Sequence, residues 1–297
     1  MANKGKISII MPAYNEASAI GEVLDKLIPT AKENRWEVIV VDDGSNDGTG
    51  KIAEEHGAKV LTHPSNRGYG ASLSTGVRAT NADVVVFIDS DGQQDQSDIP
   101  RLLEHIGQYD MVAGTRTKDS YIDLHRRLGK RILKWFADYL AKEKIPDINS
   151  GFRAFRRDIL LRYLHLMPQG FSFSTTSTLA MLKGDHQIKW IPIKTTKRIG
   201  TSTVKQLKHG PETIMLMLRL TVLFDPLRVF LPVSGILMLL AIIATVANII
   251  QDLLNEIYRM AVPTTALFLG ISAVIVFMLG LLTDQVSAIR REQHRRL

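Results

Sequence analysis

The sequence predicts an α/β domain with a mostly parallel sheet, followed by an interfacial helix and a two-helix transmembrane hairpin. Within residues 6–115, short apolar segments alternate with helical stretches, which is typical of a sheet covered by helices on both faces. Two runs without a charged residue follow near the C-terminus, Val229–Ile250 and Val262–Leu282, of 22 and 21 residues. Charge is also divided unevenly. Residues 1–115 hold 10 Lys and Arg against 17 Asp and Glu, whereas residues 116–208 hold 20 against 7.

The expected strands are short and rich in β-branched residues. They are Ile7–Met11, Val38–Val41, Lys59–Leu61, Val84–Ile88 and Met111–Ala113. Helical stretches fit between them at Ala17–Lys32, Asp47–His56, Tyr69–Ala79 and Ile99–Gln108. Ligands of such sheets bind beyond the carboxyl ends of the strands. The polar clusters that follow the first, second and fourth strands are therefore candidate ligand contacts.

The pattern is less regular beyond residue 115. It predicts, in order, a basic helix, a loop, a second helix and a basic loop, at His125–Ala141, Asp147–Arg153, Asp158–Leu166 and Lys194–Lys208. Before the basic loop, Ile188–Ile193 is expected at an edge of the sheet, because Pro192 cannot donate a hydrogen bond to a neighbouring strand. The apolar helix Pro211–Phe224 is expected at the membrane interface, with a buried core helix as the alternative.

Each uncharged run is long enough to cross roughly 30 Å of hydrocarbon as a helix. The link Gln251–Ala261 carries two acidic residues and one arginine, whereas the tail after the second run carries four arginines and two acidic residues. Positive residues favour the cytoplasmic side, and the N-terminus has no signal-peptide pattern. We therefore expect a cytoplasmic domain at 1–208, an amphipathic interfacial segment at 209–228, two transmembrane helices within 229–283 (about 229–250 and 262–282) and a basic cytoplasmic tail at 284–297. Both termini are then cytoplasmic, in a multi-pass protein of the cytoplasmic membrane.

Composition excludes some kinds of site and favours others. Cysteine is absent, which excludes disulfides, thiolate zinc sites and a catalytic thiol. An acidic first part followed by a basic middle part indicates a cation-dependent site beside an anion-binding surface. Nucleic acid, a phosphorylated substrate and an anionic lipid are all anions of that kind. The uncharged runs favour a lipid over nucleic acid.

Asp89 and Asp91 directly follow the predicted strand Val84–Ile88, in the stretch VVVFIDSDGQQD. Two carboxylates this close repel each other. A polar turn after a strand is one explanation, and a divalent-cation site is the other, since a metal ion turns the repulsion into binding. Because polar clusters also follow two other strands, the cation site is favoured.

Four motifs carry a family resemblance. They are Pro12, Tyr14, Asn15 and Glu16 after the first strand, DDGSNDGT at Asp42–Thr49, DSDG at Asp89–Gly92 and SGFR at Ser150–Arg153. In this order they resemble family 2 glycosyltransferases of the GT-A fold, which is Rossmann-like. Together with the two uncharged runs, they resemble the polyprenyl-phosphate glycosyltransferases. This group includes dolichol-phosphate mannose synthase and the bacterial undecaprenyl-phosphate glucosyl and aminoarabinosyl transferases.

The resemblance implies a role for each motif. Mg²⁺ or Mn²⁺ would be bound by Asp89, Asp91 and Gln93. The nucleotide sugar would be bound by Pro12, Tyr14, Asn15, Glu16, Asp42, Asp43, Asp89 and Ser90. Catalysis and binding of the acceptor phosphate would fall to Asp91, Arg116, Arg127, Ser150 and Arg198. The implied reaction transfers a sugar, with inversion, from UDP-glucose or GDP-mannose to undecaprenyl or dolichyl phosphate, in a homo-oligomer such as a tetramer.

The sequence also departs from the family. Gln94-Asp95-Gln96 stands where relatives commonly have His-Asp-Pro, and Thr203 stands where they commonly have lysine, the nearest one being Lys205. Asp147 lies where relatives that use a hydroxyl acceptor can place a catalytic base, and it is expected to be structural here. A hydroxyl acceptor and a membrane nucleotide sensor without catalysis remain as alternatives. A dehydrogenase is disfavoured because Leu73 replaces the third glycine of its fingerprint. A processive synthase is disfavoured because the chain has no QxxRW motif.

Overall fold

The computed structural model describes residues 5–117, 137–140, 143–170, 172–196, 206–255 and 262–295. The chain divides into two compact units, Met1–Ile214 and Met215–Leu297. The first contains the sheet and the second contains the long C-terminal helices, and each is described by itself.

The first unit is built on a seven-stranded sheet with the order β3-β2-β1-β4-β6-β5-β7. The strands are β1 (Ile7–Ala13), β2 (Glu37–Asp42), β3 (Lys59–Thr62), β4 (Val84–Phe87), β5 (Met111–Arg116), β6 (Arg153–Arg156) and β7 (Ile188–Ile193). Every neighbouring pair is parallel except those made by β6, which is antiparallel to both β4 and β5. The predicted α/β class with a mostly parallel sheet is therefore confirmed, and so is the edge position of β7.

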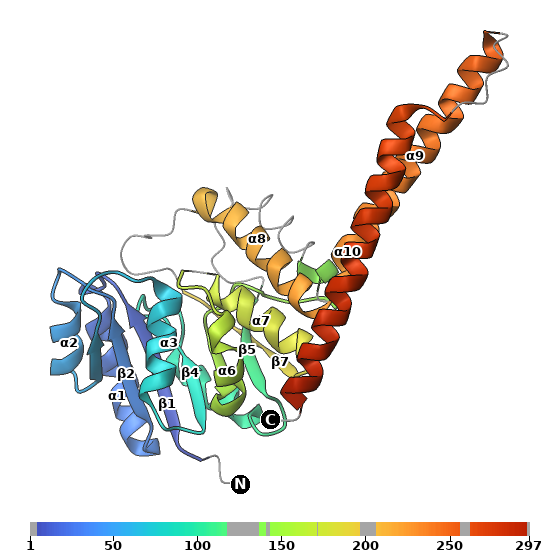
Figure 1. Cartoon of the computed structure of the whole chain (residues 1–297). Helices are drawn as coiled ribbons and strands as arrows, with labels where there is room; N and C mark the ends of the chain where they lie inside the picture. The colour runs from blue at the N-terminus through green and yellow to red at the C-terminus, as the bar shows by residue number, and fades with distance from the viewer. Residues whose placement is uncertain are drawn as a thin grey trace. The chain divides into compact units, whose positions relative to one another are not determined.

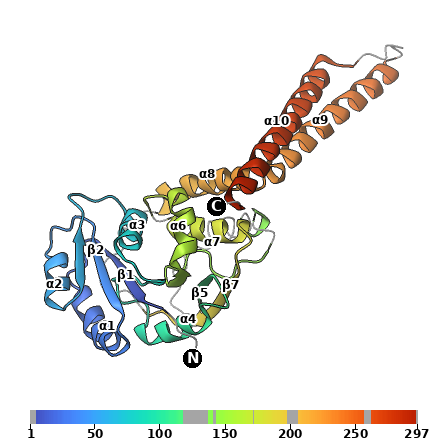
Figure 2. The same ribbon diagram turned by 60° about the horizontal axis from the view of Figure 1, so that its bottom comes forward.

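Helices cover both faces of this sheet (Figures 1 and 2). One face packs against α1 (Ile20–Asn34), α2 (Thr49–Glu55) and α4 (Ile99–His105), and the other against α3 (Tyr69–Ala79), α6 (Arg157–Tyr163) and α7 (Phe173–Lys183). Side chains of β1 alternate between the two cores. Ile9 belongs to the first core and Ile10 to the second, as the two-residue period of a strand requires. Short 3₁₀ turns at Gln96–Asp98 and Leu164–Leu166 complete the unit.

Two elements of this unit were absent from the sequence prediction. Strand β6 has only four residues, RAFR, and both of its ends are arginines, so it carries no apolar run. Helix α7 begins FSTTST, and hydroxyl residues on every side hide any amphipathic period. Both elements are nevertheless central, since β6 lies between β4 and β5 and most of α7 is buried.

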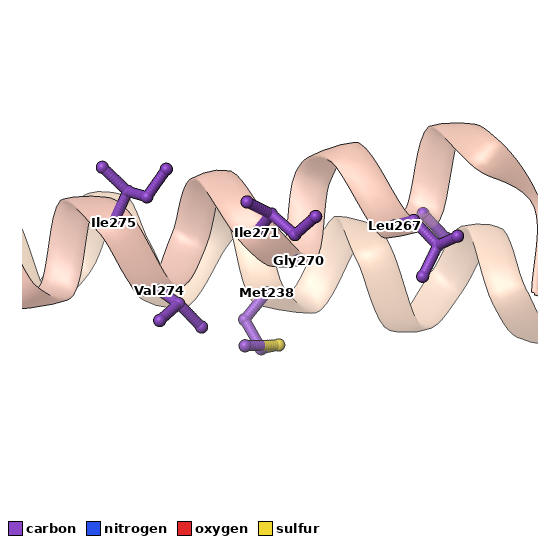
Figure 3. A pocket seen from close by; sticks show the side chains of 7 residues that line it. Met238, Leu267, Gly270, Ile271, Val274 and Ile275 are labelled. Carbon is purple, nitrogen blue, oxygen red and sulfur yellow. The ribbon is translucent and has the colours of Figure 1, made fainter.

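The second unit consists of long helices. Helix α8 (Gln206–Phe224) enters it, and α9 (Leu227–Leu254) and α10 (Thr264–Arg295) form a hairpin. Both hairpin helices are long and apolar enough to cross a membrane, and most of their large apolar side chains are exposed. An open apolar groove on the hairpin is lined by Met238 of α9 together with Gly270 and Ile271 of α10 (Figure 3). Helix α10 also continues through most of the predicted basic tail.

Candidate active site

The site lies where the carboxyl ends of β1, β2 and β4 meet. From β1 the chain adds β2 and β3 on one side and then β4 on the other, so β1 and β4 flank the switch point at which such sheets bind ligands. The Ser90 hydroxyl donates to the Pro12 carbonyl at 3.0 Å and ties the two strand ends together. Asp42 is the last residue of β2 and pairs with Ala13 of β1. Residues predicted from three separate motifs are therefore neighbours.

Hydrogen bonds join the segment after β1 to the loop after β2. The Asn15 amide donates to Ser45 Oγ at 2.9 Å, and the Asn46 amide donates to Asn15 Oδ1 at 3.0 Å. The Glu16 amide donates to Thr49 Oγ1 at 2.9 Å. Asn15 adopts a left-handed backbone with φ of 53°, a conformation that asparagine tolerates better than most residues. Tyr14 is half-buried beside it.

The Asp43 carboxylate forms hydrogen bonds with the loop that follows β3. Its carboxylate bonds His63 Nδ1 at 2.6 Å, and it accepts from the amides of Arg67 at 2.9 Å and Gly68 at 2.7 Å. The other ring nitrogen of His63 bonds Thr75 Oγ1 of α3 at 2.9 Å. The predicted nucleotide contact thus also holds residues 63–68 in place. His63 was not anticipated, although it directly follows β3 as the other polar clusters follow their strands.

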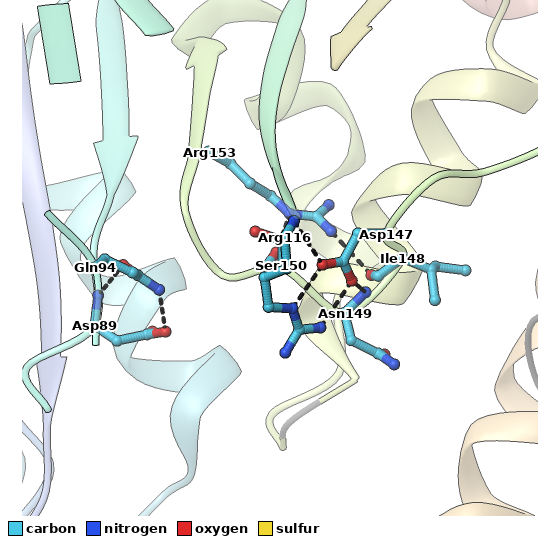
Figure 4. Close-up of polar contacts among 8 residues, drawn as sticks. All are labelled: Asp89, Gln94, Arg116, Asp147, Ile148, Asn149, Ser150 and Arg153. Atoms are coloured by element: carbon cyan, nitrogen blue, oxygen red, sulfur yellow. Dashed lines mark hydrogen bonds and ion pairs between the residues drawn. The ribbon is translucent and has the colours of Figure 1, made fainter. Parts of the chain in front are cut away.

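Asp89 is oriented from two sides. Tyr69 donates to Asp89 Oδ1 at 2.9 Å. Gln94 Nε2 donates to Asp89 Oδ2 at 2.5 Å, and Gln94 Oε1 accepts from the Asp89 amide (Figure 4). Burial, followed by the charge of Asp89, raises the pKa of Tyr69 well above its usual range, so the phenol keeps its proton. Gly151 closes the third side, because a Cβ there would lie 2.8 Å from Asp89 Oδ2. Gln94, which departs from the family pattern, thus acts on this carboxylate.

Asp91 and Gln93 complete the predicted metal-binding set. Asp91 is buried, and its Oδ1 accepts from the Gln93 amide at 3.1 Å. Gln93 is held through its backbone carbonyl, which accepts from the Thr196 amide at 3.0 Å beyond β7. Over the described ranges, no three His, Cys, Asp or Glu side chains form a metal-binding cluster. Two carboxylates and an amide oxygen fit an ion such as Mg²⁺, which usually binds one or two carboxylates and takes further ligands from substrate phosphates.

Arg116 and Asp147 form a two-pronged ion pair at the end of β5. Arg116 Nε donates to Asp147 Oδ2 at 2.6 Å and Nη2 donates to Oδ1 at 2.8 Å (Figure 4). Burial alone would raise the pKa of Asp147, but the hydrogen bonds and charge of Arg116 outweigh it and hold the pKa below its usual value. Asp147 is therefore a weak base. Arg116 Nη1 makes no hydrogen bond within the described part of the chain, and the side chain is 36% exposed.

Ser150 is buried in the loop that follows Asp147. The last residue of its SGFR motif, Arg153, is fully buried and was not singled out from the sequence. Arg127 and Arg198, predicted to bind the acceptor phosphate, lie outside the described residues, and so does Lys205. Of the predicted acceptor residues, the structure therefore locates Arg116, which is paired with Asp147, and Ser150, which is buried in the loop that follows Asp147.

Known proteins similar to this chain include several glycosyltransferases. An uncharacterized protein of Methanocaldococcus jannaschii is 31% identical over 65% of this chain and 82% of its own length. Glycosyltransferase AglJ of Haloferax volcanii is 27% identical over 100% of this chain and 99% of its own length. The undecaprenyl-phosphate 4-deoxy-4-formamido-L-arabinose transferase of Edwardsiella ictaluri is 29% identical over 54% of this chain. The match spans about half (51%) of the length of that transferase.

Solved structures show the same fold. Glucosyl-3-phosphoglycerate synthase from Mycobacterium tuberculosis, in complex with Mn²⁺, UDP and phosphoglyceric acid, superposes with a TM-score of 0.61. The two chains are 23% identical, and the likeness covers 73% of this chain and 78% of the other. In sequence, residues 225–289 match the family model described as GtrB C-terminal hairpin, and residues 8–164 match that of Glycosyl transferase family 2. Because the latter match spans more than half of the chain and contains the motifs that meet beyond β1, β2 and β4, this protein belongs to glycosyl transferase family 2.

Proposed function

We propose that this protein transfers a sugar from a nucleotide-sugar donor, UDP-glucose or GDP-mannose, to the phosphate of a polyprenyl phosphate at the cytoplasmic face of a membrane. The observation that carries the proposal is the ion pair between Arg116 and Asp147. A hydroxyl acceptor normally needs a general base, and the carboxylate in the position for that role is engaged by an arginine. The relatives named for undecaprenyl phosphate and the hairpin match support a lipid acceptor.

The donor would bind along the two hydrogen-bonded segments Tyr14–Glu16 and Asp42–Thr49. Asp89, Asp91 and Gln93 would hold a divalent cation, which when bound neutralises the charge that develops on the leaving diphosphate. Tyr69 and Gln94 fix the Asp89 carboxylate before the donor arrives, since each donates a hydrogen bond to one of its oxygens.

The acceptor needs no proton transfer. A phosphate monoester has a second pKa near 6, so at neutral pH it is largely dianionic. One of its oxygens attacks the anomeric carbon, the new carbon–oxygen bond forms as the bond to the diphosphate breaks, and the electron pair leaves with the nucleoside diphosphate. Arg116 Nη1 would hold the attacking phosphate. A single in-line displacement inverts an α-linked donor to a β-linked lipid product.

The acceptor is tested by comparing two lipids that differ only in the phosphate. Full-length protein in detergent or vesicles is given radiolabelled UDP-glucose or GDP-mannose, Mg²⁺ or Mn²⁺, and either a polyprenyl phosphate or the matching polyprenol. We expect labelled lipid only with the phosphate. Transfer to the polyprenol, with the phosphate inert, would assign the protein to hydroxyl acceptors. Nucleotide binding without transfer to either lipid would favour a sensor.

A further inference from the structure

Arg153 is a buried cation, and in the described part of the chain all its hydrogen bonds go to neutral oxygen atoms. Its side chain is fully buried at the start of β6. Two of the bonds reach the loop before β6 and three reach α7: to Ile148 O at 2.9 Å, Ser150 O at 2.5 Å, Ser174 O at 2.7 Å, Ser177 Oγ at 3.1 Å and Thr178 Oγ1 at 2.7 Å. Both hydroxyls of α7 donate their own protons to Ser174 O, which leaves their lone pairs for the guanidinium.

A buried charge of this kind is costly, and an apolar side chain of similar size can often fill such a space with equal or greater stability. Burial lowers the pKa of Arg153 to about 10, so it stays charged at neutral pH. The carboxylates of Asp147 and Asp89 oppose this shift, since their negative charges favour the charged form of Arg153. Since β6 runs between β4 and β5, Arg153 lies between the strands that lead to Asp89 and Arg116.

The bonds to the loop set the direction of two peptide groups. The carbonyl and amide of one trans peptide point in opposite directions. Holding the Ile148 carbonyl therefore turns the Asn149 amide the other way, where it donates to Asp147 Oδ1 at 3.2 Å. Asp147 in turn holds Arg116. The chain of contacts runs from Arg153 through this peptide to the Arg116 guanidinium.

The second peptide acts on the other side of the loop. Holding the Ser150 carbonyl turns the Gly151 amide away from Arg153. Gly151 itself lies against the donor side of the site, since a Cβ there would meet Asp89 Oδ1 at 2.9 Å and Tyr69 Oη at 2.8 Å. One guanidinium thus fixes both ends of a short loop. One end lies beside Arg116 (Figure 4), and the other, at Gly151, lies beside Asp89.

We propose that Arg153 is the positioning residue of the acceptor loop, residues 147–151, and that it orients Arg116, Ser150 and the Gly151 amide to bind the acceptor phosphate. Its buried charge adds to the attraction for that dianion. Arg153 does not touch the substrate; it acts through the loop. This inference rests on the proposed function, because it requires that the acceptor be a phosphate.

The test compares Arg153→Met and Arg153→Lys with Arg156→Met as the matched control. Arg156 ends the same strand, 44% exposed, and contacts Asp110 and Asp158 away from the site. Each purified full-length variant is assayed for transfer from UDP-glucose or GDP-mannose to undecaprenyl phosphate, with separate titrations of donor and lipid, and for thermal unfolding. A charge-assisted hydrogen bond corresponds to roughly a 10- to 100-fold effect.

We expect Arg153→Met to lower kcat/KM for the lipid at least about 30-fold, by the same estimate, while the dissociation constant of the nucleotide sugar changes less than about threefold. Arg153→Lys should recover only part of the loss, since lysine keeps the charge but not the planar fork. Arg156→Met should resemble the wild type. The inference is wrong if folded Arg153→Met keeps the wild-type lipid KM, or if donor and lipid parameters fall equally, as expected of a purely structural residue.

A milder variant covers the case in which Arg153→Met does not fold. Thr178→Val removes one acceptor of the guanidinium at nearly constant volume, and we expect a loss of about 3- to 10-fold confined to the lipid parameters. No loss in Thr178→Val would count against the inference. The wild type is assayed first: if it does not glycosylate the lipid phosphate, the proposed function fails, whereas an active wild type with unaffected variants overturns the role of Arg153 alone.

Discussion

At the scale of single residues, Asp89 and Asp91 have different surroundings although one residue separates them. Asp89 accepts hydrogen bonds from the side chains of Tyr69 and Gln94, so its carboxylate is oriented by the protein. Asp91 is buried at 7% exposure and is capped by the backbone amide of Gln93. A buried carboxylate beside a second one is stabilised by a cation, since the cation removes both the desolvation cost and the repulsion.

We therefore expect Asp91→Asn to abolish nearly all transfer. The substitution removes one negative charge from the proposed cation site and keeps the volume. Initial rates measured against Mg²⁺ and Mn²⁺ concentration check this. Asp95→Asn is the control, because the Asp95 side chain is exposed and accepts from the backbone amide of Ser97. Full wild-type activity in excess EDTA would contradict a metal requirement.

Arg116 and Asp147 are the second residue-scale feature. The pKa of Asp147 is lower in the folded protein than its ordinary value of about 3.9, so the ion pair stabilises the fold above that pH and is lost as pH falls through the lower folded pKa. At neutral pH the pair is intact. An acidic limb of the rate profile above about pH 5 then belongs to another group, such as the acceptor phosphate with its second pKa near 6.

Two variants separate the roles of this pair. Asp147→Asn should keep substantial kcat, because no proton needs a base, and its acidic limb should stay at the wild-type pH. Arg116→Ala should lower kcat/KM for the lipid about 10- to 100-fold while donor binding stays near normal. Profiles of kcat/KM against pH provide the measurement. If folded Asp147→Asn is inactive while Arg116→Ala is active, the acceptor is a hydroxyl.

At the scale of elements, the antiparallel strand β6 brings the loop at residues 147–151 to the carboxyl ends of the parallel strands. Its first residue pairs with Phe87 of β4 and Ala113 of β5. Because β6 begins at the carboxyl ends of the parallel strands, the residues just before it lie at the site. Gly151 fits there because it has no side chain. The closeness of Gly151 to Asp89 and Tyr69 leaves no room for a methyl group.

Gly151→Ala should therefore reduce turnover at least about 10-fold, because relieving a 2.8 Å contact must move the loop or the Asp89 carboxylate. Gly170→Ala is the control, since a Cβ there meets nothing within 4 Å. Transfer rates and unfolding temperatures of both variants are compared with wild type. Equal activity of Gly151→Ala and Gly170→Ala would show that the close contact has no catalytic importance.

At the scale of the whole molecule, the chain joins a sheet unit to an apolar hairpin. Exposed leucine, isoleucine and phenylalanine side chains cover most of α9 and α10, which is unfavourable in water and favourable in lipid. Under the proposed function, the hairpin would hold the enzyme at the membrane surface where a polyprenyl phosphate presents its headgroup. Diffusion of the enzyme toward this lipid would then be restricted to the membrane plane.

The proposed topology places the link between α9 and α10 outside the cytoplasm. Asn255 directly follows α9, and the chain contains no cysteine, so Asn255→Cys supplies a unique label. We expect an impermeant maleimide to label it in intact cells. A cysteine at Asn34, near the end of α1 in the sheet unit, is the control and should react only after lysis. The reverse labelling pattern would reverse the topology.

The sequence alone was sufficient for the features that depend on local pattern. Short apolar segments predicted six of the seven strands, all but β6, because strands buried in a sheet carry apolar runs. Uncharged length predicted both hairpin helices, because hydrocarbon excludes charge. The motifs at Pro12–Glu16, Asp42–Thr49 and Asp89–Gly92 were placed together correctly, since the ends of parallel strands share one edge.

Only the tertiary structure decided which groups face one another. The pairing of Arg116 with Asp147 spans 31 residues, and that of Tyr69 with Asp89 spans 20, so no local spacing predicts either. Arg153 ends the SGFR motif, but nothing in that motif indicates that its side chain is buried. Its burial follows from the position of β6 between β4 and β5 and from the hydroxyls of α7, which offer oxygen atoms that a hydrophobic pattern does not reveal. Hydrogen-bond complementarity between distant segments is a property of the folded chain.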